Sequence, residues 1–287
     1  MDAVERDIFG SQEIAYECLA DVERTQNFLD AINQVVRKND RVIELGTGTG
    51  VLSLFAAKAG ADPVHAFEIV KPMADIARQN IRSNKLDSVI TVYDADVTAV
   101  QMEQKQYYDL LIAEMISVGL IEEQLVPAFN NILKQGILKT SAQAMPCANK
   151  TYVELVDTDY SHFGVLLKTI QIEQTWQESK VKHVLAGPEL ISNVDFNEAI
   201  KTQTPIDPQV DKTIVFTATG NGTVNGLRLT SDSILSKEVV SGWTQCMNSP
   251  AIIPIDEFEI SIGEQVQMNI SYEMGGEMKS LIVKKLT

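Results

Sequence analysis

The chain has 287 residues, 45% of them hydrophobic and 22% charged, so it is long enough to bury a sizeable core and has the composition of a globular protein. Its formal net charge of −15 argues against a DNA or RNA partner, since a surface that binds phosphates normally shows a basic excess. The sequence has no apolar run of about 18 residues, and its first seven residues show neither a basic nor an apolar signal region, so we expect neither a membrane span nor secretion. We therefore expect no nucleic acid and no membrane partner. The charge is compatible with a cationic acceptor drawn in by the field of the protein, and solubility is the alternative explanation for it.

Cysteine and histidine residues are few and widely spaced. The cysteines are Cys18, Cys147 and Cys246, and neither His162 nor His183 shares a metal-ligand spacing with them. This pattern predicts no metal site and no disulfide framework. A reducing, cytoplasmic location is expected.

The most informative segment is 41–59, where a short apolar run meets alternating glycines and then a helical pattern. Gly46, Gly48 and Gly50 form a predicted tight turn between strand and helix. A dinucleotide fingerprint that begins at Gly46 needs glycine at the position that Val51 occupies. The spacing therefore favours S-adenosylmethionine over NAD.

The first half continues as alternating strands and helices. Such alternation predicts a Rossmann-like, doubly wound parallel sheet, with ligands at the carboxyl ends of the strands. Acidic residues lie at or near four of these ends, which suggests one site: Glu44, Glu68, Asp96 and Glu114. The predicted strands are 41–45, 63–69, 89–93 and 107–113, and the predicted helices begin at 51, 73 and 122.

From about residue 148 the pattern changes to short β-rich runs separated by glycine and asparagine turns. This half predicts an antiparallel β-barrel or sandwich. We expect residues 1–147 to form the cofactor-binding domain, with an N-terminal helical segment over 1–38. Residues 148–287 are expected to serve substrate binding or oligomerisation.

Each part of S-adenosylmethionine has a candidate partner in the first half. Glycines let the backbone lie against the methionine portion, with Glu44 at the same strand end. Glu68 follows the glycine turn by about 20 residues, where a carboxylate can accept both ribose hydroxyls. Asp96, or the backbone around Val97, is placed to meet the adenine edge.

Two further acids suggest the acceptor. Glu114 leaves the fourth strand and Glu123 lies nine residues later at a predicted helix start. If the loop folds back, both carboxylates face one volume and favour a cation such as a guanidinium. The alternative is that Glu122 and Glu123 only complement a helix dipole.

The segments 43–60 and 19–25 resemble the protein arginine N-methyltransferases. The resemblance is close over residues 19–135 and implies a methyltransferase domain followed by a β-barrel. It implies that Arg24 grips the carboxylate of the cofactor and that Glu114 and Glu123 hold the acceptor. Asp21 resembles an acid that pairs with a histidine in that family, which makes it a candidate proton acceptor.

The chain also departs from the family. The Thr-His-Trp motif is Ser241-Gly242-Trp243 here, so only Trp243 matches, and Met115 stands in place of a tryptophan. We assign both Trp243 and Met115 to substrate binding. The aromatic N-terminal segment is reduced to Phe9, and the dimerisation arm between 157 and 185 is short. A homodimer is the candidate assembly.

The sequence thus predicts an S-adenosylmethionine-dependent N-methyltransferase acting on a guanidino or amino nitrogen of a protein or small-molecule acceptor. A small-molecule methyltransferase, acting on an amino acid or a natural product, is the first alternative. A catalytically silent, cofactor-binding scaffold and an NAD oxidoreductase are the others.

Overall fold

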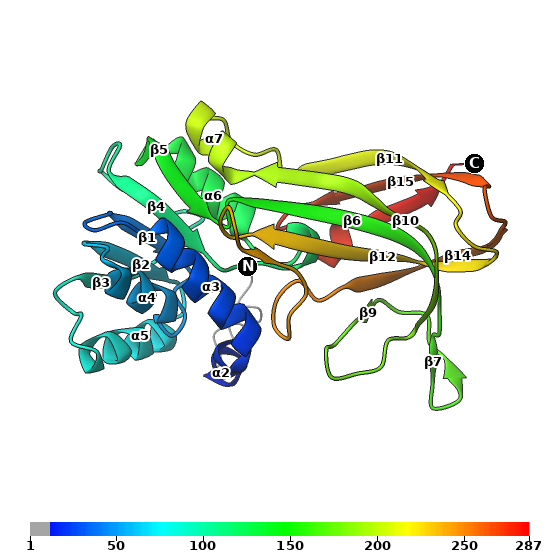
Figure 1. The fold of residues 1–287 in the computed structure, drawn as a ribbon, viewed down its shortest axis with the longest axis horizontal. Coiled ribbons are helices and arrows are strands. Elements are labelled where there is room, and N and C mark those ends of the chain that lie inside the picture. The colour runs from blue at the N-terminus through cyan, green and yellow to red at the C-terminus, as the bar shows by residue number, and fades with distance from the viewer. Residues whose placement is uncertain (1–11, 287) are drawn as a thin grey trace.

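The computed structural model of the protein describes residues 12–286. The predicted aromatic segment around Phe9 lies outside these residues. A parallel sheet with its helices occupies one end of the molecule, and long antiparallel strands form the other end (Figure 1). In the described part of the chain, every helix is too short or too polar to cross a membrane.

Two helices precede the first strand, α2 (Gln12–Ala20) and α3 (Val22–Val35). Asp21 separates them and caps α3, because its side chain accepts a hydrogen bond of 3.0 Å from the Arg24 amide. α3 then buries an apolar face that includes Phe28. Its first turn carries the Arg24 side chain inward as well.

Five strands make the parallel sheet: β1 (Val42–Leu45), β2 (Val64–Glu68), β3 (Ile90–Asp94), β4 (Tyr108–Ala113) and β5 (Leu138–Met145). Their order is β3-β2-β1-β4-β5, and all neighbours are parallel. The chain therefore reverses its progress across the sheet beside β1, which is where doubly wound folds bind ligands. The predicted parallel sheet is confirmed. β5 was not predicted, since its sequence has few β-branched residues.

The helices that pack on this sheet are α4 (Val51–Ala59), α5 (Lys71–Ser83) and α6 (Leu125–Lys134). α5 begins two residues before its predicted start, because Pro72 is favourable in the first turn of a helix. α6 begins after Glu122 and Glu123, so neither acid lies in its first turn.

The second half is antiparallel, as predicted, and consists of two main sheets. One has the order β10-β6-β12-β14-β9 with β13 paired to β12, the other the order β11-β15-β16, and β7 and β8 form a hairpin. Closure into a barrel is not seen within residues 12–286. The strands are β6 (Ala148–Thr158), β7 (Ser161–His162), β8 (Val165–Leu166), β9 (Gln171–Ile172), β10 (Val181–Asp195), β11 (Gln209–Thr217), β12 (Gly222–Ile234), β13 (Val240–Ser241), β14 (Ala251–Ile260), β15 (Gln265–Glu273) and β16 (Ile282–Lys285).

One continuous apolar core runs through both halves. Phe129 of α6 and Phe196 of α7 (Phe196–Thr202) contact each other edge to face, with ring centres 5.0 Å apart. The short 3₁₀ helix η1 (Val118–Leu120) packs on β6 and β12, and a second, η2 (Met278–Ser280), precedes β16. The loop after β4 is thus held by the antiparallel half, while the predicted boundary at 147/148 stays a prediction.

Candidate active site

Gly46, Gly48 and Gly50 connect β1 to α4, with φ angles of 71°, 53° and 84° in the left-handed region. A Cβ at Gly48 would meet no atom within 4 Å, whereas one at Gly46 would lie 3.2 Å from the Met115 side chain. Gly50 caps α4 and faces Ala77 instead. The turn therefore presents bare backbone to the space beyond β1.

Glu44 stabilises this turn through hydrogen bonds with neighbouring side chains. It is 1% exposed, accepts a hydrogen bond of 2.6 Å from the Thr47 hydroxyl and also accepts one from Ser53. Burial raises the pKa of Glu44 to about 7, against the opposing effect of the two hydroxyl donors. Its side chain is therefore committed to the shape of the turn.

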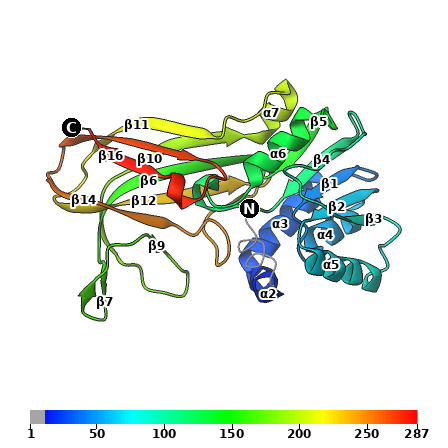
Figure 2. The ribbon, with the colours of Figure 1, turned by 180° about the vertical axis from the view of Figure 1, so that it is seen from behind.

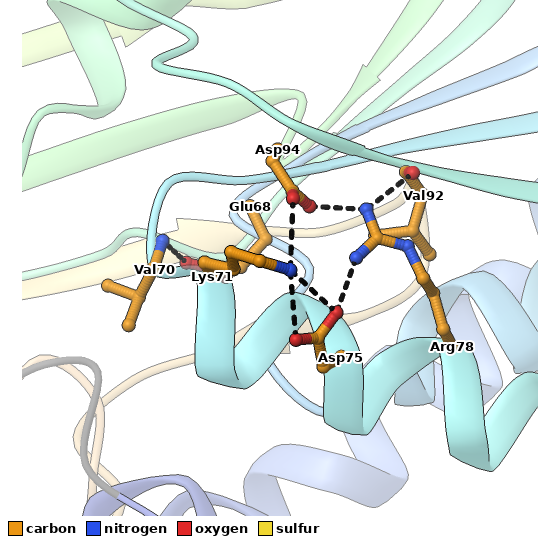
Figure 3. A network of polar contacts seen from close by, with 7 residues as sticks. All are labelled: Glu68, Val70, Lys71, Asp75, Arg78, Val92 and Asp94. Carbon is orange, nitrogen blue, oxygen red and sulfur yellow. Dashed lines mark hydrogen bonds and ion pairs between the residues drawn. The ribbon is translucent and has the colours of Figure 1, made fainter.

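Glu68 ties the end of β2 to the glycine turn. One carboxylate oxygen accepts the Gly48 amide at 2.9 Å. The other accepts the Val70 amide, also at 2.9 Å (Figure 3). A carboxylate has about four acceptor positions. Residues 12–286 use two of these positions through the hydrogen bonds given above, which leaves two for the donors of a ribose diol.

An ion network beside Glu68 joins the start of α5 to the end of β3. Arg78 donates to Asp94, to the Val92 carbonyl at 3.0 Å and to Asp75 at 2.8 Å, and Lys71 approaches both acids (Figure 3). These groups are substantially exposed, so they contribute little stability. They set the orientation of α5 at the rim of the site.

Arg24 joins α3 to the end of β4 through an ion pair with Glu114, with side chains that are 7% and 14% exposed. Its other terminal nitrogen donates to the Cys18 carbonyl at 3.0 Å. Burial alone would lower the pKa of Arg24, but the Glu114 carboxylate raises it overall. The buried Nε has no hydrogen-bond partner among the described residues.

The loop from Glu114 to Glu123 folds back on itself. The Ser117 hydroxyl accepts the Glu122 amide at 2.9 Å, and the Gly119 amide donates to Ser231 of β12 at 2.9 Å. Burial and the neighbouring Glu114 carboxylate raise the pKa of Glu123 to about 8. Since neither acid lies in the first turn of α6, the helix-dipole interpretation loses its basis.

A cavity of about 690 Å³ lies beyond the glycine turn. It brings together predicted residues from four separate segments: Arg24, Glu44, Gly46, Gly48, Glu68, Glu114, Met115 and Glu123. Glycine backbone, the Glu68 carboxylate and Arg24, whose Nε has no hydrogen-bond partner within residues 12–286, line the same space. This combination of hydrogen-bond donors, acceptors and bare backbone matches the methionine, ribose and carboxylate groups of S-adenosylmethionine.

Several predicted residues do not line this cavity. Asp96 folds onto its own turn, accepting the Thr98 amide at 2.9 Å and the Thr98 hydroxyl at 2.6 Å. Val97 is buried, and its carbonyl accepts a hydrogen bond from Asn131. Their predicted contact with the adenine has no support in this arrangement.

Asp21 and Trp243 also lie outside the cavity lining. Asp21 is 3% exposed and, besides capping α3, accepts the Thr244 hydroxyl at 2.6 Å and the Cys246 amide at 2.8 Å. It ties α3 to the segment after β13, so this geometry does not support a role as proton acceptor. The buried Trp243 Nε1 has no partner among the described residues.

Sequence reasoning missed the residues that the antiparallel half brings to the cavity, among them Gln174, Trp176, Gln245 and Ser249. Cys18 of α2 and Cys246 also line it, and burial raises the pKa of the Cys18 thiol to about 12. No local motif marks these positions. Only their place opposite the glycine turn identifies them.

Comparison with known proteins places the chain in a family. The family model described as "Ribosomal protein L11 methyltransferase (PrmA)" matches residues 21–182. An uncharacterized protein of Methanocaldococcus jannaschii is 30% identical over 271 residues, which are 93% of this chain and 95% of that protein. Probable protein arginine N-methyltransferase 1.2 of Arabidopsis thaliana is 38% identical over 120 residues. That match spans 41% of this chain and only 31% of the Arabidopsis protein.

Solved structures share the fold. The Trypanosoma brucei PRMT1 enzyme–prozyme heterotetrameric complex with AdoHcy matches with a TM-score of 0.71 at 19% identity, covering 91% of this chain and 88% of that one. The cofactor of the present protein is S-adenosylmethionine, in agreement with the donor set of the cavity. The chain belongs to the methyltransferase family that the PrmA model describes, and it is a divergent S-adenosylmethionine-dependent methyltransferase that resembles the protein arginine N-methyltransferases.

Proposed function

We propose that this methyltransferase transfers the methyl group to a nitrogen of a guanidinium group that Glu114 and Glu123 hold. The observation that supports this proposal is that both carboxylates line the cavity into which the glycine turn opens. The pair is nine residues apart in the chain, and the folded loop brings it to one place. A net charge of −15 is compatible with a cationic acceptor.

The electrostatics of the pair favour a cation as well. Burial and Glu114 raise the pKa of Glu123 to about 8 against the opposing effect of Arg24, so the charge of its ionised form is only partly compensated. A guanidinium would supply that compensation and would match the carboxylates with its planar set of donors. Arg24 already neutralises part of the charge on Glu114. Glu123 is then the carboxylate with the greater need of an external cation.

When bound, the cofactor supplies a methyl group on a sulfonium that is open to direct displacement. Gly46 and Gly48 provide the backbone for its methionine portion, and Arg24 Nε is a donor for its carboxylate. Glu68 accepts the ribose hydroxyls. Glu114 draws the positive charge of the acceptor toward itself, and Glu123, with its raised pKa, takes the proton that the methylated nitrogen releases. Orientation of the acceptor nitrogen toward the methyl group supplies much of the rate.

Labelled-methyl transfer followed by mass spectrometry tests the acceptor. The acceptors are a basic peptide with one arginine, the same peptide with lysine at that position, and free L-arginine. We expect label on a guanidine acceptor and none on the lysine peptide. Label on lysine alone, or on none of the three, contradicts the proposal.

The Glu123→Gln variant tests the site, with Glu122→Gln as its matched control. We expect Glu123→Gln to lower kcat by about 100-fold, because it removes both the charge and the proton acceptor. Binding of S-adenosylhomocysteine should change little in either variant. Glu122 also lines the cavity, but it accepts the Met278 amide at 3.2 Å and is not assigned to the acceptor. Its change to glutamine should therefore cost less than about threefold in kcat.

Two further predictions concern the whole protein. The homodimer rests on the family resemblance, and sedimentation equilibrium at several protein concentrations tests it. The cytoplasmic location rests on the cysteines, which are all free thiols in the structure.

A further inference from the structure

The segment between β9 and β10 is fixed in place by a buried carboxylate. The Glu173 side chain is 5% exposed and accepts Arg228 Nε at 2.6 Å and the Ser179 hydroxyl at 2.6 Å. Its amide donates to the Pro250 carbonyl at 2.9 Å. The Glu173 carboxylate thereby holds both ends of the segment 173–179.

Arg228 connects the Glu173 carboxylate to the antiparallel sheet. It lies on β12, and its terminal nitrogen donates to Glu154 of β6 at 2.9 Å. The guanidinium thus bridges two acids with side chains that are only 12% and 5% exposed. Buried charge pairs of this kind impose one geometry because the alternative leaves a charge without a partner.

Within the fixed segment, a tight turn presents a tryptophan. The Gln177 amide donates to the Gln174 carbonyl at 3.0 Å, and Trp176 is the third residue of that turn. Gln174 and Trp176 both line the cavity that holds Glu114 and Glu123. The Trp176 side chain is 63% exposed, so its ring is available to a ligand.

The ribbon views agree with this placement. The segment after β9 lies on the same side of the molecule as α2 and the loop after β13 (Figures 1 and 2). Residues of α2 and of that loop, including Cys18 and Ser249, line the same cavity. The α/β half supplies the groups proposed for the cofactor, whereas Trp176 comes from the opposite half.

We propose that Trp176 is an acceptor-binding residue that covers the guanidinium held between Glu114 and Glu123 with the face of its indole ring. This inference rests on the proposed function and names the residue that selects for a planar cation. A tryptophan face attracts cations through its ring quadrupole and stacks well on guanidinium groups. The carboxylates then hold the edge of the cation and the ring holds its face.

Equilibrium titration of protein loaded with S-adenosylhomocysteine tests this assignment. The probes are L-arginine, the basic arginine peptide, and the same peptide with citrulline, a neutral group of the same shape. The variants are Trp176→Ala, Trp176→Phe and the control Phe163→Ala. Phe163 is fully exposed between β7 and β8 and does not line the cavity.

We expect Trp176→Ala to weaken binding of the arginine probes by about tenfold and Trp176→Phe by about two- to threefold, since phenylalanine retains a smaller ring face. Phe163→Ala should bind like the wild type, and the affinity for S-adenosylhomocysteine should stay the same in all variants. Citrulline peptide should bind weakly and equally to wild type and Trp176→Ala.

Three results would overturn the assignment, and the third would also overturn the proposed function. Equal binding of the arginine probes by wild type and Trp176→Ala removes Trp176 from the acceptor site and leaves the proposed function intact. Equal losses for the arginine and citrulline peptides show packing rather than contact with a cation. If the wild type binds neither L-arginine nor the arginine peptide, both this inference and the proposed function fail.

Discussion

Arg24 and Glu114 form a buried ion pair that links the first turn of α3 to the loop after β4, across 90 residues of sequence. The pair places a guanidinium against the first residue of the loop 114–123, and both partners line the cavity. In this pair Arg24 neutralises Glu114, and its Nε is left for the contact with the cofactor that we propose. Loss of this one side chain therefore affects both folding and binding.

Arg24→Ala should lower the free energy of unfolding by about 3 kcal/mol, because it leaves the Glu114 carboxylate buried without a partner. The double variant Arg24→Ala with Glu114→Gln should recover part of this loss. Urea denaturation measures both effects. S-adenosylhomocysteine should bind more than about tenfold more weakly to either variant, and recovery of ligand binding in the double variant would show that Arg24 does not contact the cofactor.

The raised pKa of Glu123 predicts a pH dependence of stability with a definite sign. The pKa of Glu123 is higher in the folded protein than in the unfolded chain, so protonation of Glu123 stabilises the fold. This stabilisation is fully present below pH 4.5, the ordinary pKa of the group, and is lost as the pH rises to about 8. Urea denaturation between these limits should show stability falling with pH. Glu123→Gln should reduce this slope without abolishing it, because Glu44, whose pKa is raised to about 7, acts in the same pH range. A slope identical to that of the wild type would mean that Glu123 does not contribute.

The same pKa predicts the pH dependence of acceptor binding. A guanidinium binds the pair in which both carboxylates are ionised. Its affinity should therefore increase by about tenfold for each unit that the pH is raised toward 8, and it should stay constant above about pH 8. Titration of L-arginine into protein loaded with S-adenosylhomocysteine measures this. A flat profile in the wild type would contradict the assignment of Glu123 to the acceptor site.

Glu68 should recognise the ribose hydroxyls. Glu68→Gln should weaken S-adenosylhomocysteine binding by about 10- to 100-fold, as expected for loss of charge-assisted hydrogen bonds. An analogue that lacks both hydroxyls should bind wild type and variant alike. Asp75→Asn, in the exposed network beside Glu68, is the matched control and should bind like the wild type. If the variant binds the analogue more weakly than the wild type does, the ribose hydroxyls do not contact Glu68.

Gly48→Ala should block the cofactor rather than simply unfold the protein. A Cβ there enters open space in front of the turn, and φ of +53° adds backbone strain of about 1–2 kcal/mol. Gly136→Ala is its matched control, because Gly136 also has a positive φ, of +64°, and open space around it, yet does not line the cavity. We expect similar losses of stability but loss of S-adenosylhomocysteine binding only in Gly48→Ala. Equal binding by the two variants would contradict the proposed position of the cofactor.

Much of the α/β half could be predicted from local patterns, because strand, glycine turn and helix are contiguous between Arg41 and Ala59. The strand β5 escaped prediction because it has few β-branched residues and its register against β4 is irregular between Tyr108 and Leu110. Long β10 escaped for a related reason. Its register against β6 shifts at several points, so its side chains do not alternate simply between faces.

The site divides in the same way. Alternating glycines and the acids Glu44, Glu68 and Glu114 follow strand ends, and the carboxyl ends of parallel strands meet at one edge, so the sequence by itself determined the cofactor and its side of the sheet. Contacts between distant segments lie beyond such reasoning. Only the tertiary structure decided that Asp21 is tied to Thr244, that Arg24 pairs with Glu114 and that Trp176 faces the cavity. Burial and charge at these places depend on what the rest of the fold brings near.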